Sequence, residues 1–180
     1  RQACEDFGLE AVILPDYSDT LDAPSLPDYE TIPAGGTPVS AVRAMSGARG
    51  SLELGRTLEA LPTAAKLLSD RFGVARFALG APVGLRESDA FYDALAELAG
   101  RDMPDHLCAQ RGRLVDAYVD GHKYVSGKRA VVYGEEDLVV GLTAFLAEIG
   151  VQPVLVATGG ESRGLADAVE AVCGGLVAEA

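Results

Sequence analysis

Cysteine is scarce in this sequence of 180 residues, which contains only Cys4, Cys108 and Cys173. Their number is odd, they form no Cys-x-x-Cys pair, and no pair of histidines lies near any of them. A disulfide framework needs paired cysteines, and a self-contained zinc site needs closely spaced ligands. We therefore expect neither, and interpret the three thiols as buried or idle.

Long apolar runs are also missing from the sequence. The longest, at residues 11–14 and 151–158, are far shorter than the roughly 18 residues that cross a bilayer. Neither run is preceded by the charged and then apolar pattern of a signal peptide. These absences predict a cytoplasmic protein that has no membrane partner.

Positive charge is scarce as well, with 15 lysines and arginines against 27 acidic residues and a net charge of −12. Because the sequence has no run rich in lysine or arginine, nucleic acid is not expected as a partner. Hydrophobic residues, in contrast, make up 48% of the chain. The chain can therefore bury the core of one large domain or two small ones.

The first half of the chain alternates short apolar runs with amphipathic segments. Strands are predicted over residues 9–14, 51–54 and 76–79, and helices over residues 38–44, 58–72 and 87–99. The segment from Asp16 to Gly36 is rich in proline, glycine and acids. It predicts an irregular surface loop at the C-terminal edge of the first strand.

A long helix is predicted from Pro104 to about Val125. Its apolar stripe suggests that it packs between two α/β units, with Asp105, Asp116 and Asp120 in water and with Leu107, Leu114, Tyr118 and Val125 buried. Beyond it, residues 128–133, 135–149 and 151–157 predict a strand, a helix and a strand. This order is typical of a βαβ unit.

The predicted fold class is α/β, with parallel sheets that helices cover on both faces. We divide the chain into an α/β unit at residues 1–103, a connecting helix at 104–126 and a further α/β unit at 127–180. The second unit has room for only two or three strands, so we expect the chain to be truncated at its C-terminus, and at its N-terminus too.

Two turns that follow predicted strands are candidate ligand sites, because open α/β sheets bind ligands at the carboxyl ends of their strands. The turn Gly134–Asp137 carries three acids, which favour a helix start but repel anions. Thr158, Gly159 and Gly160 form a better anion cradle, since a glycine turn exposes backbone N–H groups. A phosphate loop at Gly121 to Lys128 is rejected, because its spacing is wrong and a strand follows it.

Single polar residues offer weaker candidates. His122 and Arg111 fall on the apolar side of the long helix, where the histidine is expected to be a core or interface residue and the arginine to pair with an inter-domain carboxylate. His106 is expected in water. Asp116 and Asp120 lie four residues apart on one helix face and read as exposed charges. No nucleophile elbow or Cys-His pair is present, so covalent catalysis has no support.

Five strings of residues together resemble one known family. They are LPDYSDTLD at 14–22, GGT at 35–37, GLRESDAF at 84–91, RGRLVDAYVDGHKYVSGKR at 111–129 and YGEEDLVVGLTAFLAEIGVQPV at 133–154. In this order they resemble the nitrogenase component 1 family. Within it they are most similar to beta-type chains, namely the molybdenum–iron protein beta subunit and its paralogue in the iron–molybdenum cofactor assembly scaffold.

This resemblance implies an internal piece of a protein with three Rossmann-like domains, covering most of the second domain, the connecting helix and the first βαβ unit of the third. It implies multi-electron reduction on metal clusters, an iron–sulfur cluster and an iron–molybdenum cofactor in the parent complex. The implied partners are an alpha-type paralogous subunit and an ATP-dependent iron–sulfur reductase. Alpha-type chains have an arginine where this chain has the acids of Gly134–Asp137, which favours the beta type.

None of the three cysteines matches a cluster ligand of the family, and the alpha-type cofactor cysteine would fall near Thr57. We therefore expect residues 1–180 to bind no cluster and to have no reductase activity alone. The expected function is a supporting part of a nitrogenase-like beta subunit or of the assembly scaffold. Two alternatives stay open: a subunit of a related tetrapyrrole reductase, and a non-redox module that binds a small anion at Thr158, Gly159 and Gly160.

Overall fold

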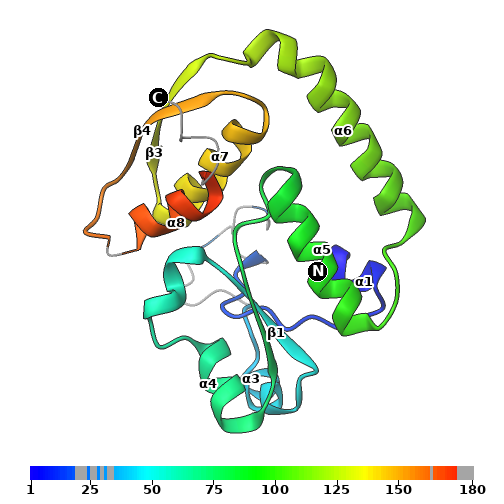
Figure 1. The fold of residues 1–180 in the computed structure, drawn as a ribbon. Coiled ribbons are helices and arrows are strands. Elements are labelled where there is room, and N and C mark those ends of the chain that lie inside the picture. Colours follow the sequence, from blue (N-terminus) through cyan, green and yellow to red (C-terminus); the bar gives the residue numbers. More distant parts are fainter. Residues whose placement is uncertain (19–23, 25–27, 29–30, 32–34, 163, 174–180) are drawn as a thin grey trace.

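The computed structural model describes residues 1–18, 24, 28, 31, 35–162 and 164–173. Figure 1 shows how its elements are arranged. In chain order they are α1 (Gln2–Asp6), α3 (Val39–Ala44), η1 (Met45–Gly47), β1 (Gly50–Leu54), η2 (Arg56–Ala60), α4 (Ala64–Phe72), β2 (Ala75–Leu79), α5 (Gly84–Ala99), α6 (Asp105–Val125), β3 (Arg129–Gly134), α7 (Glu136–Glu148), β4 (Gln152–Thr158) and α8 (Leu165–Cys173).

The first unit comprises β1, α4, β2 and α5. Its two strands pair in parallel, from Gly50 opposite Ala75 to Leu54 opposite Leu79. Both helices end at a left-handed glycine, α4 at Gly73 with φ 69° and α5 at Gly100 with φ 65°. Glycine adopts this conformation without the steric cost of a Cβ atom. The core of the unit contains three buried side chains: Phe7, directly after α1, Leu95 of α5 and Leu107 of α6.

The helix predicted over residues 58–72 is shorter in the structure. Residues 56–60 form the 3-10 helix η2, and the α-helix begins only at Ala64. Pro62 separates the two, and the Thr63 side chain accepts a hydrogen bond from the backbone N–H of Lys66. A capping threonine of this kind starts a new helix rather than continuing an old one.

The strand predicted at residues 9–14 is wrong, because this segment is irregular in the structure. Within the described ranges the ladders join only β1 with β2 and β3 with β4. Strand propensity alone does not make a strand, since its backbone groups need a neighbour to pair with. Val12 and Leu14 stay 46% and 48% exposed. The surface loop predicted for Asp16–Gly36 falls largely on residues outside the described ranges.

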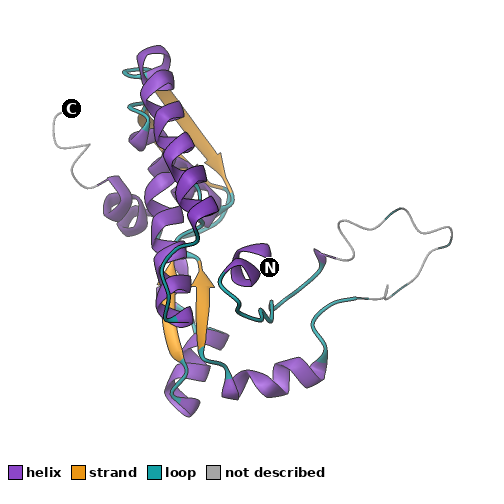
Figure 2. Ribbon diagram, turned by 90° about the vertical axis from the view of Figure 1, so that its right-hand side faces the viewer, coloured by secondary structure: helices purple, strands orange, loops and turns teal. Residues whose placement is uncertain are grey.

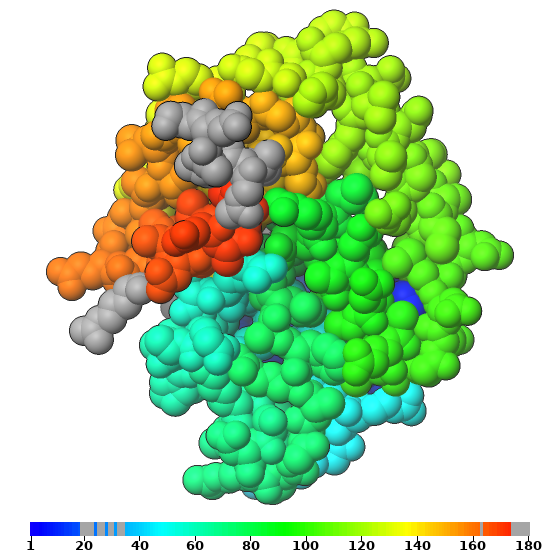
Figure 3. Space-filling view, in the orientation of Figure 1, coloured from blue at the N-terminus to red at the C-terminus, as the bar shows by residue number. Residues whose placement is uncertain are grey.

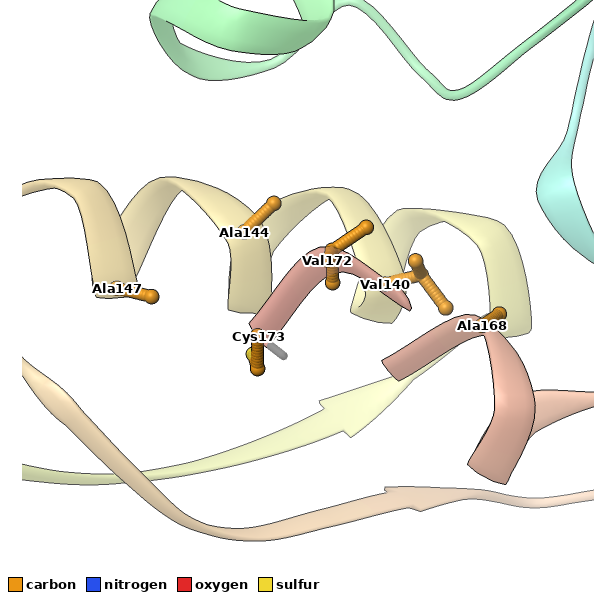
Figure 4. Close-up of a cluster of buried hydrophobic side chains, with 6 residues drawn as sticks. All are labelled: Val140, Ala144, Ala147, Ala168, Val172 and Cys173. Carbon is orange, nitrogen blue, oxygen red and sulfur yellow. The ribbon is translucent and has the colours of Figure 1, made fainter. Parts of the chain in front are cut away.

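The second unit comprises β3, α7, β4 and α8, and it confirms the predicted βαβ unit. Its strands pair in parallel, from Arg129 opposite Gln152 to Gly134 opposite Thr158. Helix α8 packs on α7 through the buried side chains drawn in Figure 4, which are Val140, Ala144, Ala147, Ala168, Val172 and Cys173. Figure 2 shows the two small sheets one above the other. Because the strands of each sheet pair in parallel and helices connect them, the predicted α/β class is confirmed.

The prediction that α6 packs between the two units is wrong. Figure 1 shows this helix passing along the outer flank of the molecule, from the end of α5 to the start of β3. Leu107 is buried, but Leu114 is 37% exposed, while Asp105, Asp116 and Asp120 are exposed as expected. The helix contacts α5 through Arg111 and α7 through Tyr118, while Leu114 between them stays partly uncovered.

Among the described residues, the structure has no helix that is both long and apolar enough to cross a membrane.

Candidate functional site

The carboxyl ends of the two sheets face each other. Strand β1 leads into η2, and strand β3 leads into the acidic start of α7. Asp137 of α7 accepts hydrogen bonds from the backbone N–H and the hydroxyl of Thr57 in η2, at 3.1 and 3.0 Å. In Figure 3 the cyan region that includes η2 lies directly against the red surface of α8. We call this junction of Arg56, Thr57, Gly80, Glu87 and Glu135–Asp137 the carboxyl-edge seam.

Each of the three acids of the predicted turn has its own hydrogen-bond partners. Glu135 caps α7, its carboxylate accepting from the backbone N–H groups of Asp137 and Leu138 at 3.3 and 3.0 Å. Glu136 accepts a hydrogen bond from the Ser162 hydroxyl. Asp137 binds Thr57 as described. The three carboxylates therefore stabilise the local fold through these hydrogen bonds. They also concentrate negative charge at the carboxyl edge of the sheet, where α/β proteins usually bind a ligand.

The environment of this turn changes the pKa of Glu136. Burial raises the pKa of Glu136, and the negative charges of Asp137 and Glu135 raise it further. A second anion brought to this turn would meet the same repulsion. The turn therefore suits a proton, a cation or a hydrogen-bond donor better than it suits an anion.

Thr158, Gly159 and Gly160, the predicted anion cradle, lie at the end of β4 close to this acidic turn. Helix α8 begins several residues later, where Ser162 Oγ accepts from the backbone N–H of Leu165 at 2.8 Å. Both glycines are exposed, and a Cβ atom on Gly159 would lie 3.1 Å from the Tyr133 hydroxyl. Anion binding there stays a prediction, and the neighbouring carboxylates oppose it.

An ion pair between an exposed arginine and a buried glutamate in the seam was missed by sequence reasoning. Arg56 donates to Oε1 of Glu87 at 2.6 Å, and the Glu87 side chain is only 7% exposed. The backbone of Gly80 lies so close that a Cβ atom there would come within 2.0 Å of Glu87 Oε2. The sequence signals were a glycine directly after a strand and a glutamate in the first turn of α5. Their partner, Arg56, could not be inferred.

The other end of α7 also reaches the first unit. Glu148 accepts hydrogen bonds from the backbone of α5 and from the Tyr118 hydroxyl of α6, at 3.2 Å for the latter. Burial raises the pKa of Tyr118 to about 12, and the charge of Glu148 adds to the effect. Sequence reasoning assigned no role to Glu148.

The single polar candidates lie apart from the seam. Arg111 pairs with both carboxylate oxygens of Asp89 at 2.8 Å, so its predicted carboxylate partner is on α5. His106 is exposed and lies 3.4 Å from Asp6. His122 is exposed rather than buried on an apolar face. Asp116 and Asp120 are exposed, as predicted from their spacing.

The three cysteines lie on three separate elements. Cys4 is half-buried in α1, Cys108 is exposed on α6, and Cys173 is buried between α7 and α8. Burial raises the pKa of the Cys173 thiol, which disfavours the thiolate that binds metals. Within the described ranges no three potential metal ligands come together. These residues do not fit an iron–sulfur cluster, which generally needs about four thiolates.

This chain matches a family model and is similar in sequence to nitrogenase beta chains. The family model described as nitrogenase component 1 type oxidoreductase matches residues 1–178. The nitrogenase molybdenum-iron protein beta chain of Frankia alni is 38% identical over 154 residues, covering 86% of this chain and 29% of that protein. The nitrogenase vanadium-iron protein beta chain of Trichormus variabilis is 31% identical, covering 91% of this chain and 35% of that protein.

Similarity extends to a solved structure described as "Nitrogenase Cp1 at pH 6.5", with a TM-score of 0.85 and 28% identity. The match covers 96% of this chain and 37% of that one. This chain therefore spans about a third of the length of the proteins it resembles.

Proposed function

The chain belongs to the nitrogenase component 1 type oxidoreductase family, and from this premise we propose that it is the part of a beta-type subunit that supports cluster chemistry without ligating a cluster. One observation carries the proposal: Glu135, Glu136 and Asp137 occupy the carboxyl edge of the β3–β4 sheet. An anionic metal cluster would be repelled there. The proposal keeps the division into residues 1–103, 104–126 and 127–180.

The partners in this proposal are an alpha-type paralogous subunit and an ATP-dependent iron–sulfur reductase. The clusters of the parent complex, an iron–sulfur cluster and an iron–molybdenum cofactor, would store electrons and reduce the substrate. Residues of this chain contribute the scaffold: Thr57 and Asp137 join the two sheet edges, and Glu148 joins α7 to α5. A cytoplasmic location is part of the same proposal.

The test uses the full-length subunit that contains this segment, produced together with its alpha-type partner. The variant with Cys4, Cys108 and Cys173 all replaced by serine should keep its iron content and its acetylene reduction within about twofold of wild type, because none of these thiols ligates a cluster. Loss of about one cluster per subunit in this variant would contradict the proposal. Replacing cysteines of the parent chain outside residues 1–180 is the matched comparison.

The same preparation separates the alternatives. An assembly scaffold would donate a cofactor precursor to a cofactor-free nitrogenase and would not reduce acetylene itself. A tetrapyrrole reductase would consume a tetrapyrrole substrate instead. A small-anion module would bind inorganic phosphate in a calorimetric titration, and replacing Gly160 by alanine would weaken the binding. Acetylene reduction without phosphate binding supports the nitrogenase proposal.

A further inference from the structure

Glu148, the last residue of α7, places one buried carboxylate among donors from two other helices. Its side chain is 8% exposed. One oxygen accepts from the backbone N–H of Leu85 at 2.7 Å and from the Tyr118 hydroxyl at 3.2 Å. The other accepts from the backbone N–H of Arg86 at 3.0 Å and from its Nε at 3.3 Å. These donors belong to α5 and α6, so three helices meet at this carboxylate.

The four donors match the capacity of the group, since an ionised carboxylate offers about four acceptor positions. Helix α5 needs such a partner, because the first N–H groups of a helix have no acceptor within it. Its own N-cap residue, Val83, provides no side-chain hydrogen bond within the described ranges. The first turn of α5 is thus capped by a residue of the second unit.

The approach of this carboxylate depends on Gly84. A Cβ atom at Gly84 would lie 2.7 Å from Oε2 of Glu148, and the φ of Gly84 is 82°. Both conditions favour glycine. The backbone at the start of α5 is therefore shaped to receive a side chain from α7.

Helix α7 is held at its other end as well, by the hydrogen bonds from Thr57 to Asp137. The two attachments, Asp137 and Glu148, lie about 17 Å apart along the helix axis. Between them, a Cβ atom on Gly141 would lie 3.4 Å from Ala81, so the helix already packs closely on the first unit. Nearby, Arg86 donates to the carbonyl of Val172 in α8 at 2.8 Å.

We propose that Glu148 is a clamp that couples the two α/β units, so that they open and unfold together and not as separate bodies. The reason is that separation would break four hydrogen bonds to one carboxylate at once, and hydrogen bonds to an ionised group contribute more to stability than neutral ones, even though water replaces them after opening. The Arg111–Asp89 pair also joins α6 to α5, but its side chains are 46% and 30% exposed. Exposed pairs of this kind contribute little.

Native-state hydrogen exchange on the full-length subunit tests this inference independently of any activity. In the wild type, the slowest amides of β1–β2 and of β3–β4 should exchange at rates within about threefold of each other, because both sheets are exposed by one opening. In Glu148→Gln, which preserves size but turns an amide NH₂ toward the α5 donors, the two sheets should diverge by at least about tenfold.

Two further variants complete the test. Glu97→Gln replaces an exposed glutamate on α5 and should leave the two rates matched. Tyr118→Phe keeps Glu148 and its backbone contacts, so it should fold and give a divergence of about fivefold, between that of the wild type and that of Glu148→Gln. The inference is overturned if the sheets stay matched in Glu148→Gln, whether both rates rise or neither does. It is also overturned if the wild type or Glu97→Gln already shows divergence.

Discussion

The hydroxyl of Thr57 donates a hydrogen bond of 3.0 Å to Oδ2 of Asp137, eighty residues further along the chain. The backbone N–H of Thr57 donates to the other oxygen of the same carboxylate at 3.1 Å. A residue just beyond β1 thereby holds a residue just beyond β3. The carboxyl edges of two separate parallel sheets are joined by one side chain.

Asp137→Ala should lower the free energy of unfolding by about 1–3 kcal/mol, because it leaves the Thr57 N–H and hydroxyl without their acceptor in a partly buried seam. Asp70→Ala, which removes an exposed acid on α4, should stay within about 0.5 kcal/mol of wild type. Urea unfolding of both variants provides the comparison. Equal stabilities would show that the seam does not depend on this carboxylate.

Gly80→Ala and Gly112→Ala should change stability in opposite directions. A Cβ atom on Gly80 would lie 2.0 Å from Glu87 Oε2 and 2.9 Å from Arg56 Nε, so the buried Glu87 side chain and its ion pair with Arg56 must move, at a cost of about 1–3 kcal/mol. Gly112 lies within α6 with nothing within 4 Å of its Cβ position, so alanine there should add about 0.5–1 kcal/mol. Thermal unfolding distinguishes the two, and a stabilised Gly80→Ala would contradict the structure.

Replacement by alanine should cost much more stability at Leu107 than at Leu114, although both leucines lie on α6. Leu107 is 6% exposed within the core of the first unit, so Leu107→Ala should cost about 2–5 kcal/mol. Leu114 is 37% exposed, so Leu114→Ala should cost no more than about 1 kcal/mol. Denaturant midpoints measure both costs. A large loss at Leu114 would restore the sequence-based expectation that this stripe is buried.

Glu136→Gln should stabilise the protein at neutral pH. The pKa of Glu136 is raised in the folded state above its ordinary value of 4.5, so its contribution to stability is present at low pH and is lost as pH rises through the folded pKa. Glutamine keeps an acceptor for Ser162 and removes the charge. The advantage of the variant should therefore shrink as pH falls toward 4.5 and be absent below it, as urea titrations at a series of pH values would show. A variant less stable than wild type at pH 7 would refute this account.

Tyr118→Phe should alter the stability profile in alkali. The pKa of Tyr118 is raised from 10.0 to about 12, so the unfolded chain loses this proton first. Its contribution to stability is therefore complete below pH 10 and is lost as pH rises through about 12. The difference in unfolding midpoint between wild type and variant should shrink over this interval. A constant difference would show that Tyr118 titrates alike in both states.

Local features of the structure could be predicted from the sequence. The βαβ unit beyond residue 127 follows from apolar periodicity, and Gly73 and Gly100 mark helix ends because only glycine readily adopts the left-handed conformation there. These signals involve residues a few positions apart. The family resemblance likewise rests on contiguous strings, and the match over residues 1–178 confirms it.

For the acids of the candidate site, the sequence predicts their position but not their hydrogen-bond partners. The sequence places Glu135, Glu136 and Asp137 between a strand and a helix, and their mutual repulsion follows from that alone. Their separate attachments to α7 itself, to Ser162 and to Thr57 do not, because two of these partners come from other elements. Glu148 reads as an ordinary helix-terminal glutamate until α5 is placed against it.

The sequence by itself determined the α/β class, the order of most elements and the acidic character of the β3–α7 turn, since each depends on neighbouring residues. The tertiary structure decided that Leu9–Leu14 pairs with no described strand and that Leu114 is left partly exposed on the flank of the molecule. It also decided which donors hold each buried carboxylate. Pairing and burial depend on which distant segments meet, and that is settled only when the whole chain packs.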